Sequence, residues 1–215
     1  MRLLLVRHAQ TASNIGRALD TAIPGAVLTG LGHEQAARLV ERLAGEHLDV
    51  VAASPLLRAR QTAGPVAVAR GLTPVILDGL REIEAGDLEM GTSAPEIESY
   101  RDVIAAWATG APEVVMPGGS SGHEFFSRFD GAVRTLENAG ARAAAVSHGA
   151  AIRTWVAARC RGVDAAAVSR RALANTGIAV VEGSTRAGWR LTGWLEEIVD
   201  DLPATGLTDA GGGSR

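Results

Sequence analysis

Short apolar runs alternate along the chain with longer segments in which apolar residues recur at helical spacing. Each run is too short for a helix and, being apolar throughout, is typical of a buried strand. The runs predict strands at residues 3–6, 49–53, 73–77 and 143–147, followed by two late strands at 178–182 and 189–194. Helices are predicted after residue 29, after residue 54, and over 94–109, 123–138 and 149–159.

Local signals mark where two of these helices begin. Thr29 is expected to cap the first, because a threonine side chain can accept a hydrogen bond from the free N–H groups of a first turn. Ser54 followed by Pro55 predicts an N-cap and a first-turn proline for the second helix. The Gly-Pro pair at 64–65 should bend or break that helix, since proline lacks a backbone N–H.

Strands alternating with helices predict an α/β fold, specifically a three-layer α/β/α sandwich with a mostly parallel sheet. The Gly- and Pro-rich stretches are short enough to be turns, so residues 1–200 are expected to form a single domain. Residues from about 84 to 125 form an excursion between the third and fourth strands, which predicts a small helical cap insertion. The Gly-rich stretch 201–215 lacks any pattern and is expected to be a flexible tail.

The composition limits the chemistry more than it limits the fold. The 215 residues are 47% hydrophobic and carry a formal net charge of −3, which disfavours a nucleic-acid surface or a polybasic membrane anchor. All 21 basic residues are arginine, so any anion site must use arginine, histidine and backbone N–H groups. Cys160 is the single cysteine and is expected to be a buried thiol. With no long apolar run and no signal peptide, the chain is expected in the cytoplasm.

Polar residues stand at corresponding places after the predicted strands. His8 follows the first strand, Arg58 lies in the first turn after the second, Glu82 follows the third, and His148 follows the fourth. Any one of them alone would be read as an ordinary surface or structural residue. Since ligands of open α/β sheets bind at the carboxyl edge of the strands, all four are expected to meet there, with Arg7 beside His8.

Two imidazoles, two guanidiniums and a carboxyl group suit the binding and transfer of a phosphoryl group. Arginine matches phosphate oxygens with two parallel hydrogen bonds, and histidine can act as a nucleophile. The helix predicted after His148 would add free N–H groups, and Gly149 would allow a close approach to them.

At these residues the chain resembles the histidine phosphatase superfamily, which contains phosphoglycerate mutases and many phosphatases. The resemblance rests on five blocks in the family order, between residue 1 and about residue 182. Residues 7–14 resemble RHG(E/Q)TxxN, 28–36 LTxxGxxQA, 54–63 SPLxRAxQTA, 80–89 LREIxxGxWEG and 146–153 VSHGxxIR. The block at 7–14 has Ala9 in place of the usual glycine, and Met90 likewise stands where glycine is frequent. Leu88 replaces a frequent tryptophan, and Ser120 a frequent glutamate.

The resemblance implies a role for each of these residues. His8 would be the nucleophile that becomes phosphorylated, and Glu82 would protonate the leaving oxygen and later activate water. Arg7, Arg58 and His148 would hold the phosphoryl oxygens and stabilise their charge.

Asn14 and the backbone N–H of Gly149 would add further phosphate contacts. By the same resemblance the reaction would need no metal and no cofactor.

The activity expected from the resemblance is that of a metal-independent phosphatase, a histidine acid phosphatase-type phosphomonoester hydrolase. Phosphoglycerate mutase-type transfer is an alternative, but residues 81–93 lack the basic stretch resembling ERHYGxLxGLNK that mutases carry. A non-catalytic phosphate-binding protein is the other alternative, and its mark would be the loss of a catalytic residue.

The expected partner is a small phosphorylated metabolite, with no nucleic acid and no membrane. An acidic excursion would oppose polyanionic substrates if it lines the mouth of the site, although its members could equally be solvated; it comprises Glu82, Glu84, Asp87, Glu89, Glu96 and Glu98. Trp155, Trp189 and Trp194 are expected in the core, with a homodimer interface as the alternative.

Overall fold

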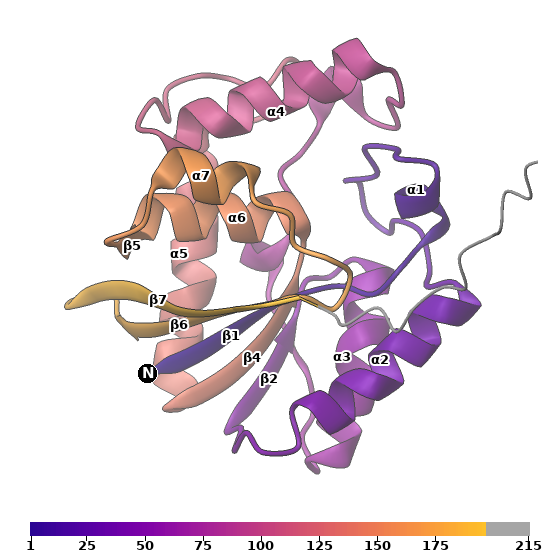
Figure 1. Ribbon diagram of the computed structural model, residues 1–215, viewed down its shortest axis with the longest axis vertical. Helices are drawn as coiled ribbons and strands as arrows, with labels where there is room; N and C mark the ends of the chain where they lie inside the picture. The colour runs from indigo at the N-terminus through magenta and orange to yellow at the C-terminus, as the bar shows by residue number, and fades with distance from the viewer. Residues whose placement is uncertain (197–215) are drawn as a thin grey trace, which may run out of the picture.

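A computed structural model describes residues 1–196, and seven strands within them form one sheet. The strands are β1 (Arg2–Arg7), β2 (Val50–Ala53), β3 (Val75–Ile76), β4 (Arg142–Ser147), β5 (Cys160–Arg161), β6 (Ile178–Ser184) and β7 (Gly188–Leu195). Their spatial order is β3-β2-β4-β1-β6-β7-β5 (Figure 1). The neighbours from β3 to β1 pair in parallel, and β6 is antiparallel to both β1 and β7. The predicted mostly parallel sheet is therefore confirmed.

Seven helices accompany the sheet within the described residues. They are α1 (Ala12–Ile15), α2 (Gly30–Arg42), α3 (Leu57–Ala69), α4 (Ala94–Ala108), α5 (Gly122–Ala139), α6 (Gly149–Arg159) and α7 (Ala165–Arg170). Two short 3-10 turns, η1 (Asp78–Leu80) and η2 (Gly86–Leu88), lie between β3 and α4. Along this part of the chain, no helix has both the length and the apolarity needed to cross a membrane.

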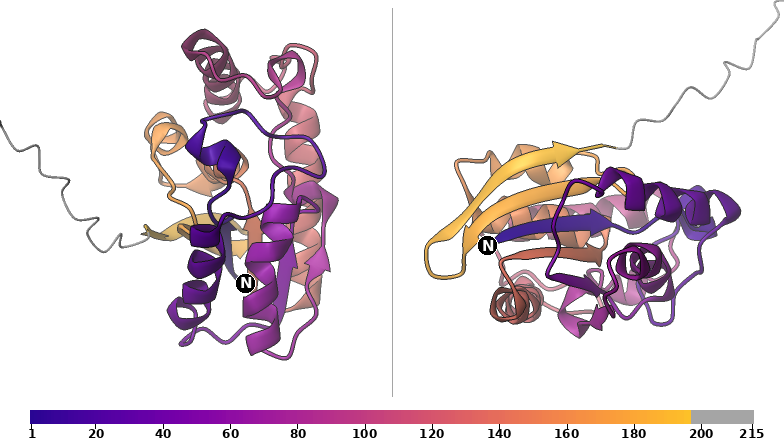
Figure 2. Two further views of the ribbon diagram at one scale, coloured as in Figure 1. Left: turned by 90° about the vertical axis from the view of Figure 1, so that its right-hand side faces the viewer. Right: turned by 90° about the horizontal axis from the view of Figure 1, so that it is seen from below.

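Alternating side chains of β1 show why the fold has three layers. Leu3 and Leu5 belong to a core shared with α5 and α6, whereas Leu4 and Val6 belong to a second core shared with α2 and α3. Because successive strand residues point to opposite faces, an apolar strand needs a helical layer on each side. Figure 2 shows helices on both faces of the sheet, which confirms the α/β/α arrangement.

Aromatic side chains fill the larger of these two cores. Trp107, Phe125, Phe129 and Trp155 follow one another with ring-centroid distances of 5.9, 5.7 and 5.6 Å. Trp155 also packs against Trp189 at 5.7 Å, and both are buried, as expected. Trp194 is only partly buried and packs against the edge of this core.

The start of α2 was predicted correctly and the start of α3 was not. Thr29 caps α2 by accepting a hydrogen bond from the Gly32 N–H at 3.0 Å. The prediction of Ser54 as N-cap with Pro55 at the first helical position is wrong, because α3 begins at Leu57. The hydroxyl of Ser54 is buried, lies 2.8 Å from Nε2 of a histidine and accepts a hydrogen bond from the Leu56 N–H at 3.4 Å, so it serves the turn before the helix.

The predicted break at residues 64–65 is also wrong. Pro65 lies inside α3, which continues to Ala69. Proline removes one backbone hydrogen bond from a helix, but Ala63, Val66 and Ala67 are buried against the sheet and the neighbouring helix. The packing of these buried residues stabilises α3 on both sides of the proline.

The third strand is shorter and more exposed than predicted. Only residues 75–76 pair, at the edge of the sheet, and both are exposed. An edge strand has a single pairing partner, so the apolar run 73–77 is not buried on both faces as expected.

The excursion at 84–125 contains η2, α4 and the first turn of α5. Its helix α4 packs on α6 and α7 and crosses above them in Figure 1. Within this segment, Glu96 and Ser93 form a capping box at the start of α4. The predicted tail at 201–215 lies outside the described residues.

Candidate active site

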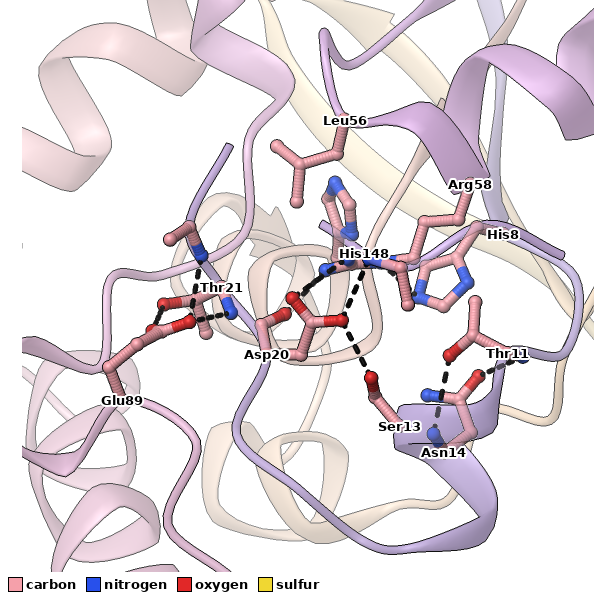
Figure 3. A network of polar contacts seen from close by, with 12 residues as sticks. His8, Thr11, Ser13, Asn14, Asp20, Thr21, Leu56, Arg58, Glu89 and His148 are labelled. Carbon is pink, nitrogen blue, oxygen red and sulfur yellow. Dashed lines mark hydrogen bonds and ion pairs between the residues drawn. The ribbon is translucent and has the colours of Figure 1, made fainter. Parts of the chain in front are cut away.

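His8 lies directly after β1 and is buried, with 3% of its surface exposed. Its Nδ1 is 2.7 Å from the carbonyl oxygen of Ala9, which can only accept a hydrogen bond. Nδ1 therefore carries the proton, and Nε2 presents a lone pair. The Nε–H of Arg58 donates to this Nε2 across 3.1 Å (Figure 3).

The surroundings of His8 keep its ring neutral. Burial, followed by the charges of Arg58 and Arg7, lowers the pKa of His8 well below its ordinary value of 6.5. A neutral ring with an unprotonated Nε2 is the form of histidine that can act as a nucleophile.

His148 joins the site from the end of β4, where it is the N-cap residue of α6. It is fully buried, and its ring centroid lies 5.2 Å from that of His8. Its Nε2 is 2.8 Å from the hydroxyl of Ser54, while its buried Nδ1 has no hydrogen-bond partner. Burial and the charge of Arg58 lower the pKa of His148 well below 6.5 as well.

Arg58 comes from the first turn of α3 and is held by the loop between α1 and α2. Its Nη2 donates to the backbone oxygen of Asp20 at 2.7 Å, and its Nη1 lies 3.5 Å from that residue's carboxylate. The Asp20 carboxylate also accepts hydrogen bonds from the Ser13 hydroxyl at 2.7 Å and the Ala26 N–H at 3.0 Å (Figure 3). Two groups of Asp20 thus hold the side chain that contacts His8, and Ser13 and Ala26 hold the Asp20 carboxylate.

Arg7 approaches the same region from the last position of β1. Its Nη1 donates to the carbonyl of Leu173 at 2.6 Å, and its buried Nε has no acceptor. Burial, with the nearby charge of Arg153, lowers the pKa of Arg7 to about 10, so it stays charged at neutral pH. A Cβ on Gly149 would lie 3.3 Å from Arg7 Nε and 3.4 Å from Arg153 Nη1, so glycine leaves room for both.

Glu82 reaches the site from the loop after η1. Its carboxylate accepts hydrogen bonds from the N–H groups of Ala150 at 3.2 Å and Ala151 at 2.8 Å, and from Ile83 at 2.9 Å. The first two belong to the first turn of α6, where the helix dipole favours negative charge. The carboxylate therefore lies at the start of the helix that begins directly after His148.

Asn14 stands slightly apart and is tied to the His8 backbone. Its Oδ1 accepts from the Thr11 N–H at 3.1 Å and from Nδ2 of Asn175 at 3.0 Å. The same Nδ2 of Asn175 lies 2.9 Å from the carbonyl of His8. Asn175 thus links the two predicted site residues.

Unsatisfied nitrogens concentrate in this site. Among the described residues, four buried side-chain nitrogens lack a hydrogen-bond partner, and three of them are Arg7 Nε, Arg58 Nη1 and His148 Nδ1. The fourth, Arg81 Nε, lies 2.8 Å from the Asp78 carboxylate in an ion pair, and Arg58 Nη1 likewise lies 3.5 Å from the carboxylate of Asp20. A buried unsatisfied polar group costs about 1–3 kcal/mol, so Arg7 Nε and His148 Nδ1 fit a ligand that brings acceptor oxygens.

Two of the departures from the family pattern have structural consequences. Ala9 is buried and avoids the left-handed region, and its N–H donates to the Thr62 hydroxyl at 3.0 Å, so the usual glycine is not needed there. Met90, in contrast, has φ +60°, a conformation that favours glycine.

Several residues of the site were missed by sequence reasoning. Ser54, Thr62 and Arg153 lie inside the blocks that carry the family resemblance, so their positions were visible although their contacts were not. Asp20 and Asn175 lie in loops without periodicity, where the sequence offers no signal. Within residues 1–196, no three His, Cys, Asp or Glu side chains gather in a group that could hold a metal ion.

The sequence is similar to a known family and to several known proteins. A sequence model described as the histidine phosphatase superfamily (branch 1) matches residues 3–197. A probable phosphoglycerate mutase, GpmB, from Erwinia tasmaniensis is 31% identical over 209 residues, which are 94% of this chain and 94% of that protein. A PE-PGRS family protein of Mycobacterium tuberculosis, PE_PGRS11, is 33% identical over 207 residues. That match covers 88% of this chain but only 35% of the longer relative.

The fold comparison agrees with the sequence comparison. The structure of a mycobacterial glucosyl-3-phosphoglycerate phosphatase in complex with VO3 superposes with a TM-score of 0.75 at 26% identity. The superposition covers 91% of this chain and 98% of the phosphatase.

Proposed function

Because the chain belongs to branch 1 of the histidine phosphatase superfamily, we propose that it is a phosphatase acting on a small phosphomonoester. In this proposal it is a histidine acid phosphatase-type hydrolase that forms a phosphohistidine on His8. The observation that carries the proposal is the geometry of His8, whose neutral Nε2 faces Arg58 while Nδ1 is fixed by a carbonyl. The phosphatase structure described above supports the same class of reaction.

In the first step, the lone pair of His8 Nε2 attacks phosphorus as the bond to the substrate's alkoxide oxygen breaks. Glu82, in its protonated form, gives its proton to that oxygen, so the alcohol leaves neutral. The Nε–H of Arg58 exchanges its contact with Nε2 for a phosphoryl oxygen. Arg7 Nε and His148 Nδ1 contact the other oxygens, since each is buried without a hydrogen-bond partner.

In the second step, water attacks phosphorus from the side that the alcohol has left. The carboxylate of Glu82 takes a proton from this water, and the P–N bond breaks. The products are inorganic phosphate and neutral His8, and Glu82 is protonated again for the next cycle. The arginines supply fixed positive charge throughout, so the steps use side chains of this chain alone.

The proposed substrate is a small phosphorylated metabolite. Two carboxylates of the acidic excursion are used within the protein: Glu84 pairs with Arg81 at 2.8 Å, and Glu96 caps α4. Their charges are therefore weak evidence against a polyanionic substrate. A panel of phosphorylated metabolites assayed for released phosphate is the experiment that identifies the substrate. Higher turnover of inositol polyphosphates than of monophosphates would contradict the proposal.

Mutase activity is the second candidate, because relatives such as the Erwinia tasmaniensis protein are named probable phosphoglycerate mutases. A mutase passes the phosphoryl group to a second substrate hydroxyl instead of water. Incubation with 3-phosphoglycerate and its bisphosphate primer separates the two, since a phosphatase releases phosphate and forms no 2-isomer.

A phosphate-binding protein without activity is distinguished by the His8→Ala variant. The proposal predicts phosphatase activity that survives EDTA and is lost in this variant. A chain that binds phosphate with no turnover would contradict the proposal.

A further inference from the structure

Arg128 of α5 is bound to the backbone of the loop that carries Glu82. Its guanidinium donates to the carbonyl oxygens of Gly79 at 2.9 Å, Arg81 at 2.8 Å and Glu82 at 2.7 Å. These three hydrogen bonds join one side chain to a four-residue stretch, and the last reaches the backbone of Glu82 itself.

Within residues 1–196, the hydrogen bonds of the Arg128 guanidinium go to these carbonyls and not to a carboxylate. Its guanidinium also lies 5.1 Å from the ring centroid of Phe125, in a cation–π contact. Burial, followed by the charge of Arg81, lowers the pKa of Arg128 to about 10, so it remains protonated at neutral pH. Hydrogen bonds from a charged donor are strong, so the half-buried guanidinium of Arg128 holds the three carbonyl groups in place.

The backbone of the loop also packs directly on α5. A Cβ at Gly79 would lie 2.2 Å from the backbone oxygen of Arg128, so only glycine allows this approach. Helix α5 and the loop therefore meet at Gly79, and Arg128 extends the contact along the loop to Glu82.

The position of the Glu82 carboxylate follows from the position of this backbone. Its oxygens must reach the N–H groups of Ala150 and Ala151 and, in the proposed reaction, the leaving oxygen. Displacements of about 1 Å in catalytic groups can cost about 100-fold in rate. We propose that Arg128 is a positioning residue that holds Glu82 where it can protonate the leaving group. This inference rests on the acid role proposed for Glu82.

A positioning role differs measurably from a merely structural one. An aryl phosphate such as 4-nitrophenyl phosphate has a leaving group that departs without a proton, whereas the alkoxide of glycerol 2-phosphate needs one. The ratio of kcat/KM for the alkyl ester to kcat/KM for the aryl ester therefore reports on the acid. A loss of folded protein lowers both values equally and leaves this ratio unchanged.

The experiment measures that ratio in the wild type, Glu82→Gln, Arg128→Met and Arg128→Lys. Lysine keeps the charge, but its single nitrogen cannot match three carbonyls as a guanidinium does, so this variant serves if Arg128→Met does not fold. Arg70→Met is the matched control, because Arg70 also donates to two backbone carbonyls, those of Leu43 and Glu46, in another loop.

General acids contribute about 10²–10⁴-fold, so Glu82→Gln should lower the ratio by about 100-fold or more. The Arg128 variants should lower it by about tenfold or more, and Arg70→Met should leave it unchanged. Adding Arg128→Lys to Glu82→Gln should lower the ratio no further, because the arginine acts through the glutamate.

A ratio that stays at the wild-type value in both Arg128 variants, while Glu82→Gln lowers it, overturns the inference and leaves the proposed function intact. A ratio that Glu82→Gln does not change overturns the acid role of Glu82, and with it the basis of the inference.

Discussion

Nε2 of His8 accepts a hydrogen bond from Nε of Arg58 across 3.1 Å, so the proposed nucleophilic atom is in direct contact with a guanidinium. This contact is compatible only with a neutral imidazole, because a protonated Nε2 has no lone pair to offer. The same arginine is one of the two charges that lower the pKa of His8. Arg58 therefore orients the proposed nucleophile and, together with burial, keeps it unprotonated.

The activity should depend on pH through the protonation of His8. The lowered pKa of His8 means that protonation removes the nucleophile only well below pH 6.5. Arg58→Gln removes a positive charge but leaves His8 buried, so the pKa of His8 should rise toward 6.5 and the acidic limb of kcat/KM should move to higher pH. The variant should also lose about 10²–10³-fold in rate, as expected for a lost oxyanion donor.

The matched control is Arg60→Gln, which removes an exposed arginine from the same helix. Its acidic limb should stay in place. If the limb of Arg58→Gln stays in place too, or moves to lower pH, Arg58 does not set the protonation of His8.

The lowered histidine pKa values also predict how stability depends on pH. Since both His8 and His148 have folded-state pKa values below 6.5, the unfolded chain binds protons more readily than the folded chain below that pH. The free energy of unfolding should be insensitive to these groups above about pH 6.5 and should fall as the pH drops toward the folded-state values. Urea unfolding at several pH values measures this. His148→Asn should make the free energy of unfolding decline less steeply below pH 6.5. An unchanged slope would contradict the lowered pKa of His148 as a cause of the decline.

Gly149→Ala should separate activity from stability. The added Cβ would lie 3.3–3.4 Å from Arg7 and Arg153, so one of these side chains must shift by a few tenths of an ångström. We expect kcat/KM to fall about tenfold through the displaced guanidinium. Alanine is the better helix former, so Tm should not fall. Gly131→Ala on α5, whose added Cβ would make only an ordinary contact with Arg134 Nη2 at 3.7 Å, should leave activity unchanged. Wild-type activity in Gly149→Ala would show that this close approach is not needed.

Met90→Gly is predicted to stabilise the protein. Met90 is 57% exposed and has φ +60°, so its side chain contributes little burial while its backbone is strained. A left-handed conformation costs a non-glycine residue about 1–2 kcal/mol, part of which glycine loses to chain entropy. The net gain should be about 0.5–1 kcal/mol in the free energy of unfolding. Met90→Ala keeps the strain, so equal stabilities of the two variants would contradict this explanation.

Glu89 connects the excursion to the loop that holds Arg58. Its carboxylate accepts hydrogen bonds from the N–H groups of Thr21 at 2.8 Å and Ala22 at 3.0 Å, and from the Thr21 hydroxyl (Figure 3). Glu89→Ala should lower the free energy of unfolding by about 1–3 kcal/mol, because these donors lose a charged acceptor. It should also lower kcat/KM, since the neighbouring Asp20 holds Arg58. Full activity in a destabilised Glu89→Ala would restrict this carboxylate to a structural role.

The sequence indicated the layers of the fold and the meeting place of the site because both follow from periodicity. A four-residue apolar run such as 3–6 requires a helix on each face, and polar residues placed after parallel strands must share one edge. The same rule places the candidate residues His8, Arg58, Glu82 and His148 at one edge of the sheet.

The remaining contacts could not be predicted, because they depend on how loops pack. The hydroxyl of Ser54 can cap a helix or bind a histidine, and only the position of His148 decides between them. Asp20 holds Arg58 from a loop without periodicity, and Arg128 reaches the Glu82 loop from a helix about 46 residues away.

The phosphohistidine on His8 is the central claim, and trapping it is the most direct test. Glu82→Gln should form the intermediate from 4-nitrophenyl phosphate, whose leaving group needs no proton, but should hydrolyse it slowly without the general base. After a rapid alkaline quench, mass spectrometry should find one phosphoryl group on the peptide that contains His8. The peptide should be unmodified in the His8→Ala, Glu82→Gln double variant. A phosphoryl group on another residue, or turnover by the double variant at the rate of Glu82→Gln, would contradict the account.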